Sequence, residues 1–199
     1  MSGAFPISTA KFESLGIKST QNTIISKSQS GKKLARQIDG QRFGFTARII
    51  TGKRSDVYGE LMAFIIKQRS GKENFTIIPP EVEDARGTAS GTPHGTASAG
   101  ATSITLGGTG TGTLLSGDYI KFANHNKIYM VVADQSDIST GSLTIEPPLT
   151  TAVSSSDITY DNVPFTVHLT NDMQEFGVVG ADKDGNALYQ YEFDVEEAL

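Results

Sequence analysis

Residues 41–78 read QRFGFTARIITGKRSDVYGELMAFIIKQRSGKENFTII, and this stretch decides the fold class. From Gln41 to Thr51, apolar or aromatic residues alternate with polar or small ones, and a period of two indicates a β-strand. A segment with apolar residues at helical spacing follows, and Phe75–Ile78 then indicates a short strand that two prolines end. The stretch therefore predicts a helix packed against a sheet.

The helix is expected over residues 55–70. The hydroxyl of Ser55 can cap the first turn, Asp56 lies at the positive end of the helix dipole, and Gly71 can supply a left-handed stop. The apolar face comprises Val57, Leu61, Phe64 and Ile65, with Tyr58 and Met62 beside them. Such a stripe is typical of a helix that packs on a core.

Short strands separated by turn residues occupy most of the remaining chain. Before the helix, Asn22–Ser28 indicates a strand, and turns are marked by Gly16, Gly31, Gly40 and Gly52. After residue 114, strands recur every 8–15 residues, which is typical of a small barrel or sandwich. The strands expected there are Tyr119–Phe122, Lys127–Val132, Leu143–Ile145, Asp157–Tyr160, Pro164–Thr170, Asp172–Val179 and Ala187–Val195.

The segment between these parts is different in composition. Residues 81–112 are polar and rich in Gly, Thr, Ser and Ala. Because this segment has too few large apolar residues to form a packed core, we expect a linker or extended arm. A short strand is expected within it at Thr102–Leu106. The predicted fold is mainly β: a β-sandwich with one α-helix plus an inserted small β-barrel-like module. Residues 1–86 would form the sandwich, 87–161 the linker and the inserted module, and 162–199 the strands that return to the first sheet.

Composition excludes several classes of protein. The 199 residues include no cysteine, which excludes disulfide frameworks, thiolate metal sites and thiol nucleophiles. No run of about 18 apolar residues occurs, and the first ten residues lack the pattern of a secretion signal. Charge is uneven: residues 1–80 carry a net +8 and residues 81–199 a net −13. Solvated faces on separate elements would explain this, and so would surfaces of opposite charge that meet within or between subunits.

Motifs for phosphate, nucleophile and calcium chemistry are missing. The chain has no GxxxxGK[ST] and no GxSxG, and Gly107–Gly112 lacks a following helix start, so a flexible hairpin tip is expected there. Asp182–Asn186 resembles the start of a calcium loop, but Ala187 stands where glycine is needed and Phe193 where glutamate is needed. We therefore expect a β-turn at residues 182–186.

Metal-ligand and acid–base clusters are not evident either. The three histidines, which have no partner at ligand spacing, are His94, His125 and His168. The carboxylate pairs Glu81/Glu83 and Glu196/Glu197 are expected on exposed segments, where nothing would raise a pKa. The sequence thus predicts no enzyme and no catalytic, cofactor-binding or metal-binding residues.

Several short sequence segments, taken in their order along the chain, resemble segments of a known protein family. FTARII at 45–50, LMAFIIKQRSG at 61–71 and FTIIPP at 75–80 together resemble the N-terminal part of distal tail proteins of long-tailed bacteriophages. In that family a strand, a helix and a strand ending in proline form part of a β-sandwich. Four phrases resemble the small β module that phage tail proteins carry after the helix, at residues 86–93, 115–122, 127–131 and 144–149. NVPF at 162–165 and YEFDVEE at 191–197 resemble the return to the first sheet.

The resemblance implies a virion structural protein of the phage tail, assembled in the host cytoplasm. It would form a hexameric ring at the tail tip or baseplate hub and contact tail tube, hub or tip proteins. DNA would pass through the channel without specific binding, and no membrane insertion is implied. Two alternatives stay open: a receptor- or carbohydrate-binding module on a virion, which exposure of Tyr119 or Tyr129 would favour, and an enzyme whose site is assembled from distant residues.

The acidic excess suggests a use within such a ring. A channel that passes DNA should not bind it, and negative charge on its lining repels phosphate. We therefore expect Asp and Glu side chains to face the bore. A bore lined by Lys32, Lys33, Arg36 and Arg42 would refute this expectation.

Overall fold

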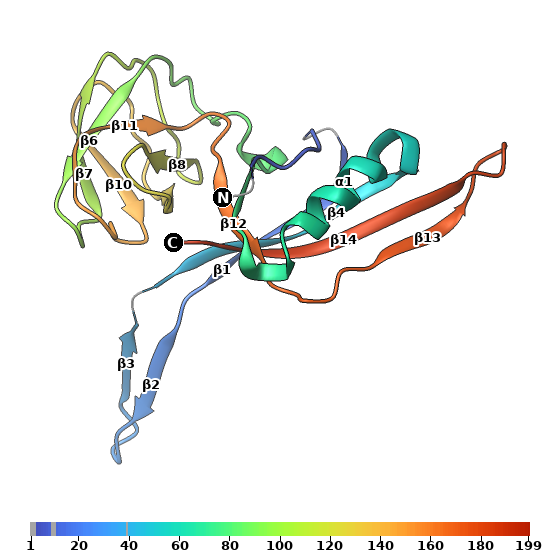
Figure 1. Cartoon of the computed structure of the whole chain (residues 1–199). Helices are drawn as coiled ribbons and strands as arrows, with labels where there is room; N and C mark the ends of the chain where they lie inside the picture. The colour runs from blue at the N-terminus through green and yellow to red at the C-terminus, as the bar shows by residue number, and fades with distance from the viewer. Residues whose placement is uncertain (1–2, 9–10, 39) are drawn as a thin grey trace.

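A computed structural model describes residues 3–8, 11–38 and 40–199. It contains a long twisted sheet, a small barrel beside one end of that sheet, and a two-stranded hairpin that protrudes from the sheet (Figure 1). The predicted fold class is confirmed: the chain is mainly β, with one α-helix and an inserted small barrel. Among the described residues, no helix has the length and apolar character to cross a membrane.

The main sheet is antiparallel and has the order β1-β4-β14-β12-β5, with β13 paired to the free half of β14. Its strands are β1 (Phe12–Thr20), β4 (Arg42–Lys53), β5 (Phe75–Ile77), β12 (Phe165–Leu169), β13 (Phe176–Ala181) and β14 (Ala187–Glu197). The outer edge of β5 is covered, because Thr76 exchanges backbone hydrogen bonds with Gly3 and Phe5. β1 is the edge strand at the other side of the sheet, and β13 lies beside β14 on the same side as β12; each of the two pairs with one strand only among the described residues.

One face of this sheet holds the core. Alternate residues of β4 and β14, from Phe43 to Ile49 and from Tyr191 to Val195, point to that face and are almost fully buried. The helix α1 (Gly59–Lys67) lies over the same face and buries Leu61 and Ile65 against it. Burial of each large apolar side chain contributes about 1.5–3 kcal/mol, so this layer supplies most of the stability of the sheet.

The ends of the helix differ from the prediction. Residues Arg54–Tyr58 form a π-helical turn, η2, so Ser55 lies inside a turn and donates its hydroxyl hydrogen to Asp56 instead of capping α1. The left-handed residues after α1 are Arg69 (φ 53°), just before the 3-10 turn η3 (Ser70–Lys72), and Ser70 (φ 61°), the first residue of that turn. Gly71 is needed for a different reason: a Cβ there would lie 2.6 Å from the carbonyl oxygen of Leu169.

The barrel is closed in the order β10-β7-β6-β11-β8-β9 and has a separate core. Its strands are β6 (Pro93–Ala97), β7 (Ser103–Gly108), β8 (Tyr119–Phe122), β9 (Ile128–Val131), β10 (Ser142–Glu146) and β11 (Val153–Thr159). A 3-10 turn, η4 (Pro80–Val82), leads from the main sheet towards the barrel. Closure pairs every strand on both sides, so the barrel has no open edge.

The expectation of a linker over residues 81–112 was wrong for its second half, although the short strand expected within it at Thr102–Leu106 is confirmed as β7. Both β6 and β7 lie there, and Ile104 and Leu106 of β7 point into the barrel core. The flexible hairpin tip expected at Gly107–Gly112 was also wrong, because the turn between β6 and β7 contains Gly100 (φ 82°), and the stretch after β7 is held by a bridge between Ser90 and Thr111.

Small residues are required because the barrel wall is tight. A Cβ at Gly95 would lie 2.5 Å from a ring carbon of Phe122.

We expect Gly95→Ala to lower the free energy of unfolding by about 1–3 kcal/mol, the usual cost of overpacking a core. The added methyl would also meet Ile104 at 2.9 Å, and Phe122 is fully buried, so neither side chain has space to move. Gly107→Ala is the matched control on the neighbouring strand, because nothing lies within 4 Å of a Cβ there. Urea unfolding of both variants tests this, and equal free energies of unfolding would contradict it.

Candidate interaction surfaces

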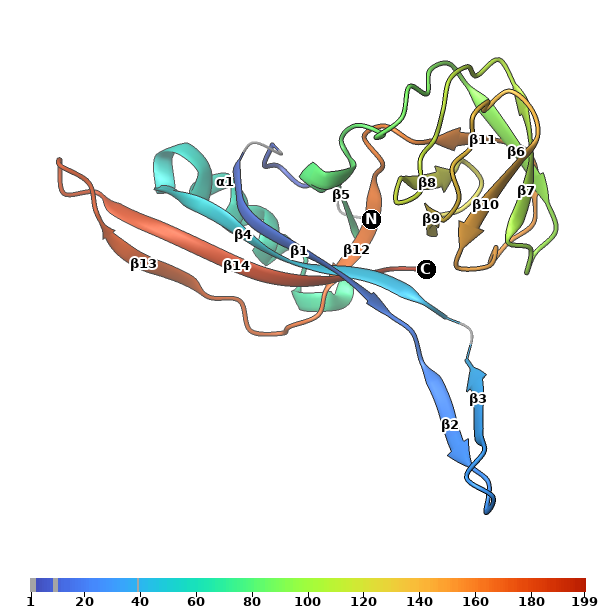
Figure 2. The same cartoon turned by 180° about the vertical axis from the view of Figure 1, so that it is seen from behind.

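The protruding hairpin is the first candidate surface. In the part of the chain that the structure describes, its strands β2 (Thr23–Lys27) and β3 (Lys33–Gln37) pair only with each other. Both views show the hairpin leading away from the sheet and barrel (Figure 2). We call residues 22–38 the arm. The predicted strand at 22–28 is thus confirmed. A lone two-stranded hairpin is marginally stable in water, so the arm needs a surface to pack on.

Both faces of the arm carry apolar side chains. Residues that pair directly share a face of a ladder, and successive residues alternate between faces. Because Ser26 pairs with Leu34, Leu34 lies on the same face as Ile24, while Ile25 lies on the other. These three side chains are 53–58% exposed. A partner must therefore cover the arm on both faces to bury them.

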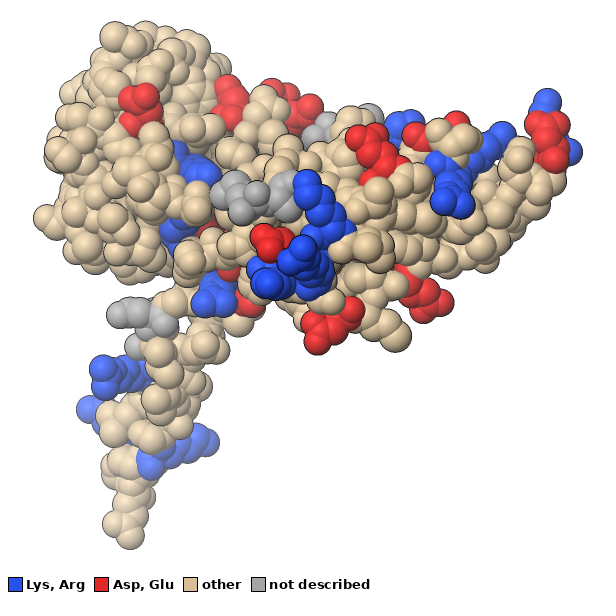
Figure 3. Space-filling model, viewed as in Figure 1, with Lys and Arg blue, Asp and Glu red and all other residues tan. Residues whose placement is uncertain are grey.

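The charge of the arm is opposite to that of the rest of the chain. The arm contains four basic residues and no acidic one, namely Lys27, Lys32, Lys33 and Arg36. The rest of the chain has 13 basic and 22 acidic residues, a net charge of −9. Figure 3 shows basic but no acidic side chains on the protruding arm. Part of the positive net charge of residues 1–80 therefore lies on the projecting arm.

The face of the main sheet opposite the core is the second candidate surface, and it is charged. Three cross-strand ion pairs lie on it: Lys18–Asp194 at 3.0 Å, Arg48–Glu192 at 3.5 Å and Arg42–Glu196 at 3.7 Å. Hydrogen bonds from Thr46 and Lys18 hold the pKa of Asp194 below its usual range. Exposed pairs of this kind contribute about 0–1 kcal/mol each, so they affect orientation more than stability.

The junction between barrel and sheet is the third candidate surface, and an ion pair is buried in it. Nζ of Lys127 lies 2.5 Å from a carboxylate oxygen of Glu197, and the two side chains are 2% and 0% exposed. The carboxylate also accepts backbone N–H bonds from Ile128 (2.6 Å) and Phe43 (3.2 Å). Burial lowers the pKa of Lys127, and Glu197 opposes that shift. The pair joins β9, β4 and β14, and so holds the barrel to the sheet.

Glu197 corrects one expectation from the sequence. The pair Glu196/Glu197 was expected to be exposed, but only Glu196 points to the polar face, where it meets Arg42. Alternation along β14 from Phe193 and Val195 places Glu197 on the core side, and that signal was present in the sequence. Glu81 and Glu83 lie on exposed positions, as expected.

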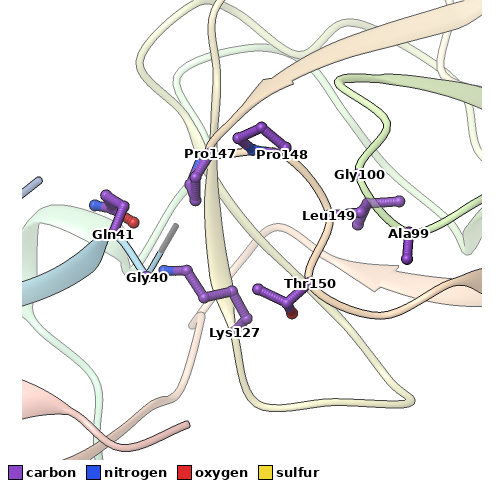
Figure 4. A pocket seen from close by; sticks show the side chains of 9 residues that line it. All are labelled: Gly40, Gln41, Ala99, Gly100, Lys127, Pro147, Pro148, Leu149 and Thr150. Carbon is purple, nitrogen blue, oxygen red and sulfur yellow. The ribbon is translucent and has the colours of Figure 1, made fainter. Parts of the chain in front are cut away.

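A pocket of about 490 Å³ opens at the same junction (Figure 4). We call it the junction pocket; its lining residues are Gly40, Gln41, Ala99, Gly100, Lys127, Pro147, Pro148, Leu149 and Thr150. Gln41 is 3% exposed and donates its amide N–H to Ser19, but its amide oxygen has no hydrogen-bond partner. In Figure 4 that oxygen lies on the side of Lys127 and Pro147. Buried polar atoms are normally paired, so this oxygen is an unused hydrogen-bond acceptor at the pocket.

The other candidate positions have structural partners. His94 contacts Asp157 at 2.7 Å, and His125 contacts Tyr129 at 2.8 Å, while His168 lies on β12. Within the described ranges, no group of three or more His, Asp or Glu side chains could hold a metal ion. Asp182 accepts backbone bonds from Asp184 and Asn186 at 2.8 Å, which makes the expected turn between β13 and β14.

The two tyrosines that would have favoured glycan binding are not free. Tyr129 is fully buried in the barrel. Tyr119 is half-buried at the junction, with its ring 5.5 Å from that of Phe43 and 5.9 Å from that of Phe165. Neither ring offers a flat exposed platform for a sugar.

We expect the stability of the protein to fall as the pH drops below about 6.5, the ordinary pKa of histidine. Burial, together with the positive charges of Lys121 and Lys127, lowers the pKa of His125. The unfolded chain therefore binds a proton at a pH where folded His125 stays neutral, and protonation favours unfolding. His125→Gln should flatten the dependence of the urea midpoint on pH between 7.5 and 5.5. His94→Gln is the control, and an equal slope in wild type and His125→Gln would contradict the prediction.

No protein-family model and no curated protein matches this chain. The three surfaces described above are therefore the basis for assigning a function.

Proposed function

We propose that this protein is a non-enzymatic virion structural protein, a ring-forming subunit of a phage tail tip or baseplate hub that connects the tail tube to the distal tail apparatus. The observation that carries the proposal is the arm, a basic hairpin with apolar side chains on both faces that projects from its own subunit. Such an element costs conformational entropy and gains no burial in a monomer, so its use lies in an assembly.

The edges of the main sheet support the same assignment. Strands β1 and β13 have outer edges without a strand partner among the described residues, and Val178 and Val179 of β13 are 60% and 54% exposed. Open edges of this kind invite pairing with another chain. A head-to-tail contact repeated around an axis uses two different surfaces of each subunit, and it forms a ring when the rotation between neighbours closes. The hexamer and the position in a phage tail come from the sequence resemblance.

In this ring the polar face of the sheet is the surface suited to the bore. The side chains of Glu192, Asp194 and Glu196 point to that face, where Arg or Lys side chains balance them. Such a surface presents little net positive charge to DNA. The placement of acidic side chains in the bore stays a prediction. Of the residues that would refute it, Lys32, Lys33 and Arg36 lie on the arm, whereas Arg42 lies on the polar face and pairs there with Glu196.

The alternative of a receptor- or carbohydrate-binding module gains no support from Tyr119 and Tyr129, because one is buried and the other is packed at the junction. The residues that line the junction pocket include no aromatic ring for a sugar to stack on.

Mass measurement in solution tests the proposal. Sedimentation velocity and native mass spectrometry should detect an assembly with six subunits, alone or after the addition of tail tube protein. Assembly should strengthen as salt is lowered, because oppositely charged surfaces meet. A chain that stays monomeric at every concentration, with and without tail proteins, would overturn the proposal. Turnover of a substrate would overturn its non-enzymatic part.

A further inference from the structure

We propose that the junction pocket is the receptor for the arm of a neighbouring copy of this chain. The inference rests on the proposed function, since it requires copies to assemble, and it names the site at which they engage. One arm would place an aliphatic side chain against Pro147, Pro148 and Leu149. A backbone N–H of the same arm would bond to the amide oxygen of Gln41.

The chemistry of the pocket favours a polypeptide over a charged ligand. Its walls come from proline, leucine, alanine, glycine and threonine, and the buried charge of Lys127 is balanced by Glu197. Oε1 of Gln41 is a buried acceptor without a hydrogen-bond partner among the described residues, and it requires an N–H or O–H donor. The wall is also preformed, because Leu149 accepts a backbone bond from Gly100 (2.7 Å) and donates one to Ala101 (2.9 Å).

The arm carries backbone N–H donors and exposed apolar side chains, the groups that the junction pocket can bind. Each strand of an isolated hairpin has one outer edge with free backbone N–H groups, and Ile24, Ile25 and Leu34 are exposed beside them. The positive arm also complements the net −9 of the rest of the chain. Within the described residues, the arm and the junction pocket of each molecule both lack a partner. The arm of one copy therefore complements the junction pocket of another copy.

The arm of the same subunit cannot fill this pocket. Gly40 and Gln41, which follow the arm in sequence, are part of the pocket lining, so the pocket lies at the base of the arm. The strands then lead away from the barrel, and the turn at Ser28–Lys32 lies at the far end of the projection (Figures 1 and 2). The contact is therefore head-to-tail, the type of contact that forms a ring when the rotation between neighbours closes.

Disulfide trapping in the full-length chain tests the contact, since the chain has no cysteine of its own. A mixture of Leu34→Cys and Ala99→Cys chains should form a disulfide-linked dimer under mild oxidation, because Ala99 is an exposed residue on the pocket lining. The control mixture pairs Leu34→Cys with Ser136→Cys, at an exposed position in the β9–β10 loop. We expect at least tenfold more cross-linked product in the first mixture.

A second readout uses the rim of the pocket. Ala99→Trp should fill the pocket and weaken self-association at least tenfold, while Ser136→Trp should leave it unchanged. Both positions are exposed, so folding is preserved. If wild type assembles but cross-linking and assembly do not distinguish Ala99 from Ser136 variants, the pocket inference is overturned and the proposed function stands. If wild type never assembles, both are overturned.

Discussion

Replacement of Ile24, Ile25 and Leu34 together by threonine is expected to abolish assembly and leave the fold of each subunit intact. These side chains are more than half exposed and make no part of either core. Threonine is β-branched, a shape that suits a strand, so the hairpin itself should persist. Loss of three apolar contacts in an interface costs about 1 kcal/mol or more each, which corresponds to an affinity at least about a hundredfold weaker.

Sedimentation velocity measures the loss of assembly, and circular dichroism with a thermal scan checks the fold. Ile66→Thr is the matched control, because Ile66 is 70% exposed but lies on α1, away from the arm. We expect this control to assemble as wild type does. If the triple variant assembles with wild-type affinity, the arm is not the element that joins subunits.

Glu197→Gln is expected to lower the free energy of unfolding by about 3–5 kcal/mol, because it leaves the buried ammonium of Lys127 without a counter-ion. A loss of this size is a large share of the total stability of a domain, which is about 5–15 kcal/mol. The double variant Lys127→Met/Glu197→Gln removes both charges and should recover at least half of the loss. Urea unfolding of the two single variants and the double variant gives the coupling energy.

The neighbouring residue provides the control for this experiment. Glu196→Gln removes the same charge from the same strand, but Glu196 pairs with Arg42 at 3.7 Å on the exposed face. Its effect should stay below about 1 kcal/mol. Equal losses for Glu196→Gln and Glu197→Gln would contradict the view that burial makes the Lys127–Glu197 pair important.

The buried pair also bears on the orientation of the barrel. Lys127 immediately precedes β9, and its ammonium lies 4.8 Å from the ring of Phe43 on β4, so the same side chain contacts both parts of the molecule. Ile128 packs in the core of the main sheet although it belongs to a barrel strand. The barrel is therefore fixed to the sheet, and the junction pocket has a defined shape.

Local sequence patterns are enough to predict the elements whose residues follow a strong period. The alternation from Phe43 to Ile49 predicts β4, that of Leu188 to Phe193 predicts β14, and the apolar stripe of residues 57–65 predicts the buried face of the helix. These patterns work because a side chain's direction depends on its own backbone period, whatever its distant neighbours are. The same rule would have placed Glu197 in the core.

The remaining features depend on contacts between distant parts of the chain. Strands β6 and β7 form from a Gly-, Thr- and Ser-rich stretch because barrel closure supplies their hydrogen bonds and the tight wall at Gly95 admits no larger residue. The buried Lys127–Glu197 pair and the junction pocket join segments that are 70 or more residues apart or lie in different strands. Local periodicity carries no information about which distant segments meet, because that choice depends on the packing of the whole chain.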